Sequence, residues 1–324
     1  MRLKLVLSEL GVLLSLTLLM NLSNLSGVWA ADKLKFATPV RTAAHLSLPA
    51  LAAEDGGFWK EENLEIEWTP FAGGPLMMQA LAAGAAPTGY IGPEEVIRAI
   101  SKGIPLLIVA DLKQRQDFIV WVLRDSSIRK PDDLKGTKVG ITQIGSMGQI
   151  QAIVFAKATG LDGKFRFVAA GGVPQTIAAL KARAIDALVL TAFTMAPMKV
   201  VGEAREVVLL AEYLPKEWTG LVLTAQKRFV ENRPDVVRRV VRAVVKSTNF
   251  VMKNPQWSVE KMKSFLGYSD ELARYVYGLL EYAKDGKINR KALVNHWNVL
   301  AENGIITKEE APPVEQMYRE GFVD

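Results

Sequence analysis

The chain has 324 residues, a formal net charge of +6, two histidines and no cysteine. The length exceeds what one ordinary hydrophobic core fills, so two domains are expected, and 49% apolar with 23% charged residues is a globular composition. The lack of cysteine excludes a disulfide framework, a thiolate zinc site, a cysteine nucleophile and a cysteine-linked lipid anchor. Two histidines argue against a multi-histidine metal centre.

The first 30 residues have the pattern of a secretory signal peptide. Arg2 and Lys4 precede an apolar run over residues 10–20, and the segment ends on Val28-Trp29-Ala30. The run is shorter than the ~18–20 residues that a membrane span needs. We expect cleavage after Ala30 and export to a bacterial periplasm, an uncleaved anchor being the alternative.

From residue 33 to about 226, short apolar runs alternate with helical patterns. Helices are predicted over about 75–83 and 147–159, and a third is predicted to begin at Pro174. Proline at the first helical position and glycine after the last residue are typical helix boundaries. The alternation predicts an α/β fold with largely parallel or mixed sheets. Strands are predicted at 34–38, 64–68, 105–110, 118–123, 138–141, 165–169 and 185–190.

After about residue 226 the pattern is helical only. Asn232 is predicted to cap a helix with Pro234 in its first turn, and valines over 237–245 form one apolar stripe. Arginines 238, 239 and 242 lie outside this stripe. We interpret them as a solvated helix face and not as a nucleic-acid patch, because no aromatic platform or binding motif accompanies them.

Two segments 99 residues apart share a template. Residues 73–85 (GGPLMMQALAAGA) and 172–184 (GVPQTIAALKARA) both fit G-x-P-x4-A-L-x-A-x-A. The template describes a helix that is opened by glycine and proline and followed by a strand. Chance is one explanation, and two halves of related architecture with a ligand between them is the other.

Motifs of catalysis and phosphate binding are mostly absent. The chain has no G-x-x-x-x-G-K-[ST], G-x-G-x-x-G, H-E-x-x-H or G-x-S-x-G sequence, and Ser146 as a nucleophile would need a histidine base. The pair Asp132–Asp133 is predicted to cap a helix. The pair Glu94–Glu95 is given the same structural role, the alternative being that one of them faces a cleft and binds a cationic group.

Four glycine-rich helix openings stand out, at 73–75, 92–93, 145–146 and 171–172. A helix N-terminus offers unpaired N–H groups and a partial positive charge, which suit an anion or a carbonyl. Four such openings at strand-to-helix turns point to the carboxyl ends of a sheet, where open α/β folds bind ligands. Any single one of them also fits an ordinary helix cap.

An ordered set of short motifs runs through residues 33–324. The motifs are AEDGGF at 53–58, ENL at 62–64, GGP at 73–75, ALAAG at 80–84, GP at 92–93, KG at 102–103, DLKG at 133–136, VG at 139–140, GS at 145–146, ALKA at 179–182, IDA at 185–187 and NP at 254–255. With these motifs in this order, the chain resembles the periplasmic substrate-binding proteins of ATP-driven (ABC) importers in the SsuA/THI5-like (NMT1-like) family. The chain departs from the family at Ala85-Ala86-Pro87, where relatives usually carry an aspartate that the second template keeps as Asp186.

The resemblance implies a two-lobed type II periplasmic binding protein fold with a ligand cleft between the lobes and a helical C-terminal region. Lobe 1 is expected from 33–115 plus 226–324 and lobe 2 from 116–225, with the hinge at the two crossings near 116–120 and 220–226. Ligand binding would draw the lobes together. A monomer is the family default.

Candidate ligand-binding residues follow from these positions. Arg41, after the first strand, can grip a carboxylate or sulfonate, and His45 can donate to a ligand oxygen. Phe193 can stack on a planar ligand, Trp218 being a weaker candidate for that role. A surface arginine, a structural histidine and ordinary helix caps are the alternative interpretations. The remaining candidates are Gly74, Gly92, Gly145, Ser146 and Thr191.

The sequence therefore favours a non-enzymatic solute receptor that delivers a small organic anion or small aromatic compound to an ABC permease and ATPase complex. The compound is expected to be a sulfonate, a carboxylate or pyrimidine-like. No metal, cofactor or nucleic-acid partner is expected. One alternative is an enzyme on the same fold, of the thiamine-pyrimidine or menaquinone pathway type; another is a sensory receptor for a signalling partner.

Overall fold

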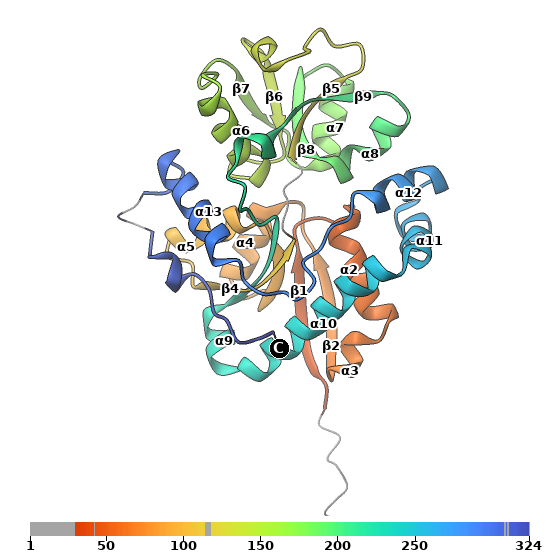
Figure 1. The fold of residues 1–324 in the computed structure, drawn as a ribbon, viewed down its shortest axis with the longest axis vertical. Helices are drawn as coiled ribbons and strands as arrows, with labels where there is room; N and C mark the ends of the chain where they lie inside the picture. The colour runs from red at the N-terminus through yellow and green to blue at the C-terminus, as the bar shows by residue number, and fades with distance from the viewer. Residues whose placement is uncertain (1–29, 42, 114–117, 308, 310, 324) are drawn as a thin grey trace, which may run out of the picture. The chain divides into compact units, whose positions relative to one another are not determined.

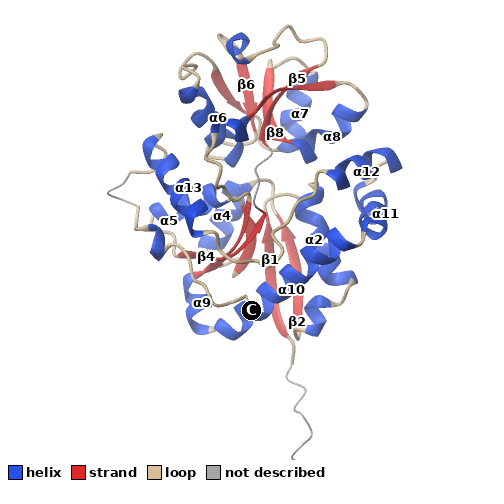
Figure 2. Ribbon diagram, in the orientation of Figure 1, coloured by secondary structure: helices blue, strands red, loops and turns tan. Residues whose placement is uncertain are grey.

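A computed structural model describes residues 30–41, 43–113, 118–307, 309 and 311–323. In this part of the chain, strands form two five-stranded sheets and helices cover both (Figure 1, Figure 2). All but the last residue of the predicted signal peptide, 1–30, lies outside the described residues, as do residues 114–117 at the first predicted crossing. Both sheets belong to one unit, residues 32–324.

The first sheet has the strand order β2-β1-β3-β10-β4. Strand β1 pairs in parallel with β2 and β3, and β10 runs antiparallel to both of its neighbours. β3 and β4 therefore both run parallel to β1, and their carboxyl ends lie at one edge. The strands are β1 (Asp32–Thr38), β2 (Leu64–Pro70), β3 (Thr88–Ile91), β4 (Leu106–Lys113) and β10 (Leu221–Gln226).

The second sheet has the order β7-β6-β8-β5-β9. Strand β6 pairs in parallel with β7 and β8, whereas β5 is antiparallel to β8 and β9. The start of β5 therefore lies beside the carboxyl ends of β6, β7 and β8. The strands are β5 (Phe118–Leu123), β6 (Lys138–Ile141), β7 (Arg166–Ala169), β8 (Ala187–Thr191) and β9 (Ala204–Leu209).

Helices connect many of the strands, and the described region after β10 contains helices and loops but no further strand. Short 3-10 turns lie at Pro131–Leu134, Leu210–Tyr213 and Val314–Gln316. Among the described residues no helix is both long and apolar enough to cross a membrane. The helices are α2 (Ala44–Asp55), α3 (Phe58–Glu61), α4 (Gly74–Ala82), α5 (Pro93–Ser101), α6 (Met147–Ala158), α7 (Val173–Lys181), α8 (Ala192–Val200), α9 (Lys227–Asn232), α10 (Pro234–Lys253), α11 (Pro255–Leu266), α12 (Asp270–Gly278) and α13 (Arg290–Glu302).

Each sheet is buried on both faces, as the alternation of side chains along its strands requires. In β1, Phe36 packs into a core with α2 and α10, while its neighbour Ala37 packs into another with α4, α5 and α13. In the second sheet, Val120 faces α6 and Trp121 faces α7 and α8. The near-continuous apolar runs of the sequence are explained by this double burial.

The structure confirms the α/β class and most of the predicted elements. The predicted strands appear within three residues of their expected ends, and so do the three helices predicted between them. Strands β9 and β10 are not predicted, and β3 is predicted only as the strand that follows the first repeat template, without bounds. Asn232 was expected to cap the long helix; instead it ends α9, and Arg233 precedes α10 without a side-chain cap.

Two of the three arginines of α10, Arg239 and Arg242, are less exposed than a solvated face would be, whereas Arg238 is exposed. Arg242 forms an ion pair with the buried Glu62 at 2.6 Å, and Arg239 bonds Asp32 at the start of β1. These two arginine contacts tie α10 to the first sheet. Elsewhere, Asp133 behaves as predicted, because its carboxylate accepts hydrogen bonds from two backbone N–H groups at its turn.

The two repeat segments occupy the same place in their sheets. Helix α4 lies between β2 and β3, and α7 lies between β7 and β8, with the same length and an offset of 99 residues at both ends. Gly73 and Gly172 precede these helices in extended, non-helical conformations, each followed by a proline in the first turn. Strand β10 pairs in the first sheet, although residues 221–225 fall in the predicted lobe 2; the lobe division itself stays a prediction.

Candidate ligand-binding site

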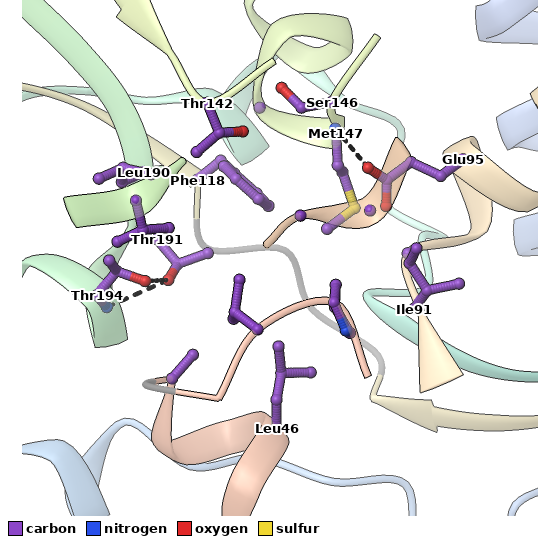
Figure 3. A pocket seen from close by; sticks show the side chains of 18 of the residues that line it. Leu46, Ile91, Glu95, Phe118, Thr142, Ser146, Met147, Leu190, Thr191 and Thr194 are labelled. Atoms are coloured by element: carbon purple, nitrogen blue, oxygen red, sulfur yellow. Dashed lines mark hydrogen bonds between the residues drawn. The ribbon is translucent and has the colours of Figure 1, made fainter. Parts of the chain in front are cut away.

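A cavity lies where the carboxyl ends of the parallel strands of both sheets face each other (Figure 3). It borders about 830 Å³ of space free of protein atoms, open solvent included. Val40 and Ile91 line it from the first sheet, and Thr142 and Thr191 line it from the second. The walls mix aliphatic side chains with a few polar groups.

Six helices begin at this cavity. Each contributes its first residues or the residue before them to the wall, so unpaired backbone N–H groups surround the space. The aligned peptide dipoles add partial positive charge at every one of these ends. The lining residues concerned are Ala43 before α2, Gly73 and Gly74 at α4, Gly92 before α5, Ser146 and Met147 at α6, Val173 at α7 and Thr191 before α8.

Five of the predicted site residues line the cavity: His45, Gly74, Gly92, Ser146 and Thr191. They come from both sheets, at the strand-to-helix turns where the sequence placed them. The prediction that they contact a ligand is not tested by their position alone and stays a prediction.

The structure places three other candidates elsewhere. The Arg41 side chain is exposed, and its guanidinium lies 5.7 Å from the ring centre of Trp68 and 4.8 Å from that of Phe265. Phe193 is fully buried, with its ring centre 4.3 Å from that of His45. Gly145 does not line the cavity; a Cβ there would lie 1.7 Å from an Arg98 guanidinium nitrogen. The predicted ligand contacts of these three residues stay predictions.

Trp218, the weaker stacking candidate, is also buried away from the cavity. Its ring centre lies 3.6 Å from that of His296, a fully buried histidine of α13. Aromatic character along the sequence does not distinguish a ring that packs in the core from one that faces a ligand.

Sequence reasoning missed several lining side chains, among them the buried Lys113 and the hydroxyls of Thr142 and Thr194. Glu95, also buried and ionisable, lines the cavity as well and was given a cleft-facing role only as an alternative. The cleft-facing alternative for the pair Glu94–Glu95 is the one that the geometry favours. Lys113 ends a buried strand, and a lysine at the end of an apolar run was the available signal.

Both glutamates lie in the first turn of α5 and both bond to α6. Glu95 Oε1 accepts from the backbone N–H of Met147 at 3.2 Å, and Glu94 Oε1 accepts from Gln151 Nε2 at 2.9 Å. A helix N-terminus favours acidic residues in this position. Gly74 leaves room for the Glu95 carboxyl, because a Cβ there would lie 2.1 Å from Oε1.

Burial dominates the ionisation of these groups. Desolvation, and then the charge of Glu94, raises the pKa of Glu95 to about 8. Desolvation raises the pKa of Glu94 to about 7, against the hydrogen bond from Gln151. Desolvation and the nearby charge of Lys113 lower the pKa of His45 to about 3, so that this imidazole is neutral.

The opposite side of the cavity carries hydroxyls. Thr191 caps α8 by accepting from the backbone N–H of Thr194 at 3.3 Å, and the two hydroxyl oxygens lie 2.9 Å apart. Figure 3 shows this pair on the side facing away from Glu95. His45 Nδ1 is buried without a hydrogen-bond partner in the described part of the chain.

Comparisons with known proteins give several relatives. The chain is 24% identical over 221 residues to a binding protein of Brucella abortus (68% of this chain, 67% of that protein) and 25% identical over 214 residues to the taurine-binding periplasmic protein of Escherichia coli (64% of each). It is also 21% identical over 248 residues to a 4-amino-5-hydroxymethyl-2-methylpyrimidine phosphate synthase of Saccharomyces cerevisiae (69% of this chain, 68% of that protein).

The fold matches a solved structure, the alkanesulfonate-binding protein SsuA from Xanthomonas axonopodis pv. citri bound to MOPS. The TM-score is 0.78 at 15% identity, with 90% of this chain and 99% of that one covered. This likeness confirms the predicted periplasmic binding protein fold. The family model described as NMT1/THI5 like matches residues 45–258, which include both repeat helices, all of α10 and all but the first residue of α2. The chain therefore belongs to the NMT1/THI5-like family.

Proposed function

We propose that this protein is an extracytoplasmic solute receptor that binds a small organic compound in the cavity and delivers it to the permease and ATPase complex of an ABC importer. The observation that carries the proposal is the convergence of six helix N-termini from both sheets on one cavity. Such a site holds an oxygen-bearing group without a metal or a fixed cation. The names of the taurine-binding and alkanesulfonate-binding relatives agree with this function.

The ligand is a small organic anion or a small aromatic compound, with a sulfonate, carboxylate or pyrimidine-like group. Backbone N–H groups, the Ser146 hydroxyl and the Lys113 ammonium provide donors to its oxygens, while Ile91 and Phe118 provide apolar contact.

The signal-peptide pattern of residues 1–30 supports export to the periplasm. A periplasmic receptor acts by changing conformation on binding, because the permease distinguishes the ligand-bound form from the empty one. The ligand shifts the equilibrium between the two forms only by the difference in its affinity for them.

Catalysis on the same fold is the second candidate, since a pyrimidine phosphate synthase is among the relatives. Recovery of the bound compound separates the two functions. We expect mass spectrometry of protein purified from the periplasm to detect a small molecule that is released chemically unchanged after long incubation.

Thermal-shift screening of sulfonates, carboxylates and pyrimidines tests the proposal directly. A true ligand raises the melting temperature progressively with its concentration. The variant Thr191→Val, Thr194→Val is expected to reduce this shift, and the exposed Thr307→Val serves as its control. If no compound of these classes binds, or if the compound is converted to a product, the receptor proposal is wrong.

A further inference from the structure

The carboxyl group of Glu95 is an unusual component of the cavity wall. Only 7% of the residue is exposed. Within the described residues its one hydrogen bond is the bond to the Met147 backbone N–H, which holds Oε1 and leaves Oε2 without a bonded partner. The wall around it is formed by Gly74, Gly92 and the side chains of Ile91 and Met147.

No ion pair in the described part of the chain includes Glu95. The charged or titratable groups around it are Glu94 and Arg98 on its own helix, and Lys113 and His45 across the cavity. The Glu94 charge opposes ionisation of Glu95, and Arg98 favours it only weakly. A buried carboxylate without a bonded cation is costly, so it either keeps a proton or takes a cationic partner from elsewhere.

The internal repeat gives this group a counterpart. At the offset of 99 residues, Gly92 corresponds to Thr191 and Glu95 corresponds to Thr194, and all four line the cavity. Figure 3 shows Glu95 and the threonine pair on opposite sides of the space. Equivalent positions of the two halves therefore carry an acid on one side and a hydroxyl on the other, so a solute with two different ends has one preferred orientation.

We propose that Glu95 is the specificity-determining residue of the cavity and selects solutes that carry a protonated amine, bound at its carboxylate with the oxygen-bearing end of the solute toward Thr191 and Thr194. This inference rests on the proposed receptor function and adds the class of solute. An ammonium group supplies the missing cation and N–H donors to Oε2. A solute with an anionic group at this position meets an acid instead.

The ionisation of Glu95 gives the inference a second, independent readout. Burial keeps the empty site largely protonated at neutral pH, since the pKa of Glu95 is raised to about 8. A bound ammonium stabilises the ionised form of Glu95, so binding at pH 7 releases about one proton. Affinity for an amine therefore increases as the pH is raised toward 8, by up to roughly tenfold per pH unit. An anion bound beside Glu95 requires the protonated acid instead, so its affinity stays nearly level well below pH 8 and falls as the pH passes 8, a slope of opposite sign.

The test uses matched pairs of probes with the full mature chain. The pairs are 2-aminoethanesulfonate with ethanesulfonate, 3-aminopropanoate with propanoate, and 4-(aminomethyl)pyrimidine with 4-methylpyrimidine. Titration calorimetry is run from pH 6 to 8 in two buffers of different ionisation enthalpy, which measures proton release. The variants are Glu95→Gln and, as a control, Glu231→Gln at an exposed site of α9.

We expect the amine-bearing member of at least one pair to bind more tightly by on the order of tenfold to a hundredfold. Glu95→Gln should remove this preference and the proton release, and Glu231→Gln should keep both. If Glu95→Gln does not fold, the pH slope of the wild type decides. Equal binding within every pair, or a slope of opposite sign, overturns the inference and leaves the receptor function standing; no binding by any probe overturns both.

Discussion

Replacement of Gly74 by alanine tests how the Glu95 carboxyl is held. The added Cβ would lie 2.1 Å from Oε1 and 2.4 Å from both Cδ and Oε2. The carboxyl must withdraw by about 1 Å to reach ordinary van der Waals separation. Its bond to the Met147 N–H, already 3.2 Å long, is then broken.

The expected cost in stability is small and the expected cost in selectivity is larger. Loss of the hydrogen bond costs about 0.5–1.5 kcal/mol if Glu95 is neutral and about 1.5–3 if it is ionised. Alanine in place of glycine in a helix returns up to ~1 kcal/mol. We therefore expect the free energy of unfolding to fall by about 1 kcal/mol, while the preference for amine-bearing probes is lost.

Urea unfolding gives the stability term, and the amide resonance and hydrogen exchange of Met147 report directly on the broken bond. Gly278→Ala in α12 is the matched control, because a Cβ there has no atom within 4 Å. The decisive comparison is a double-mutant cycle with Glu95→Ala, which removes the clash. If Gly74→Ala costs the same in both backgrounds, or leaves the Met147 amide unchanged, the carboxyl is not held as described.

Three further results are expected. Gln151→Met removes the Gln151 hydrogen bond to the buried Glu94 and should reduce the free energy of unfolding, measured by urea titration, by about 1–3 kcal/mol. The control Gln256→Met, on the surface of α11, should change it by less than about 0.5 kcal/mol. Burial raises the pKa of Glu94 and Glu95 to about 7 and 8, so these two carboxyl groups hold more protons in the folded than in the unfolded state. Burial lowers the pKa of His45 and His296 to about 3, which opposes this effect only below about pH 6.5. Stability should therefore fall as pH rises from 6.5 toward 8, and a flat profile that the double variant Glu94→Gln, Glu95→Gln does not alter would contradict this. Arg41→Ala should leave ligand affinity within about twofold by calorimetry, since the guanidinium packs on Trp68 outside the cavity, and a larger loss would restore the predicted anion contact.

The sequence predicts the architecture well because strand and helix patterns are local. Double burial of each sheet gives the apolar runs from which β4, β5 and β8 are recognised. Strand β3 (Thr88–Ile91) is only four residues long, with glycine at its second position, so it lacks a readable pattern. β10 is recognisable only through its pairing with β3 and β4, which are distant in the chain.

The site is predicted less completely, for reasons of side-chain direction. Glycines and caps at strand-to-helix turns are set by backbone geometry, so Gly74, Gly92 and Thr191 lie where expected. Phe193 is two residues beyond Thr191, yet its ring turns into the core toward His45. Glu95 differs from an ordinary first-turn acid only in its burial, which no pattern along the chain records.

The offset of 99 residues also allows the cavity to be engineered by exchanging residues at equivalent positions of the two halves. Because Glu95 and Thr194 hold equivalent positions in the two halves, the swap Glu95→Thr with Thr194→Glu transfers the acid to the other half while keeping the composition of the wall. The new acid would stand at the start of α8, as the old one stands at the start of α5. A solute with two different ends would then bind in the same space in the reversed orientation, so two substitutions would set the orientation of the bound solute.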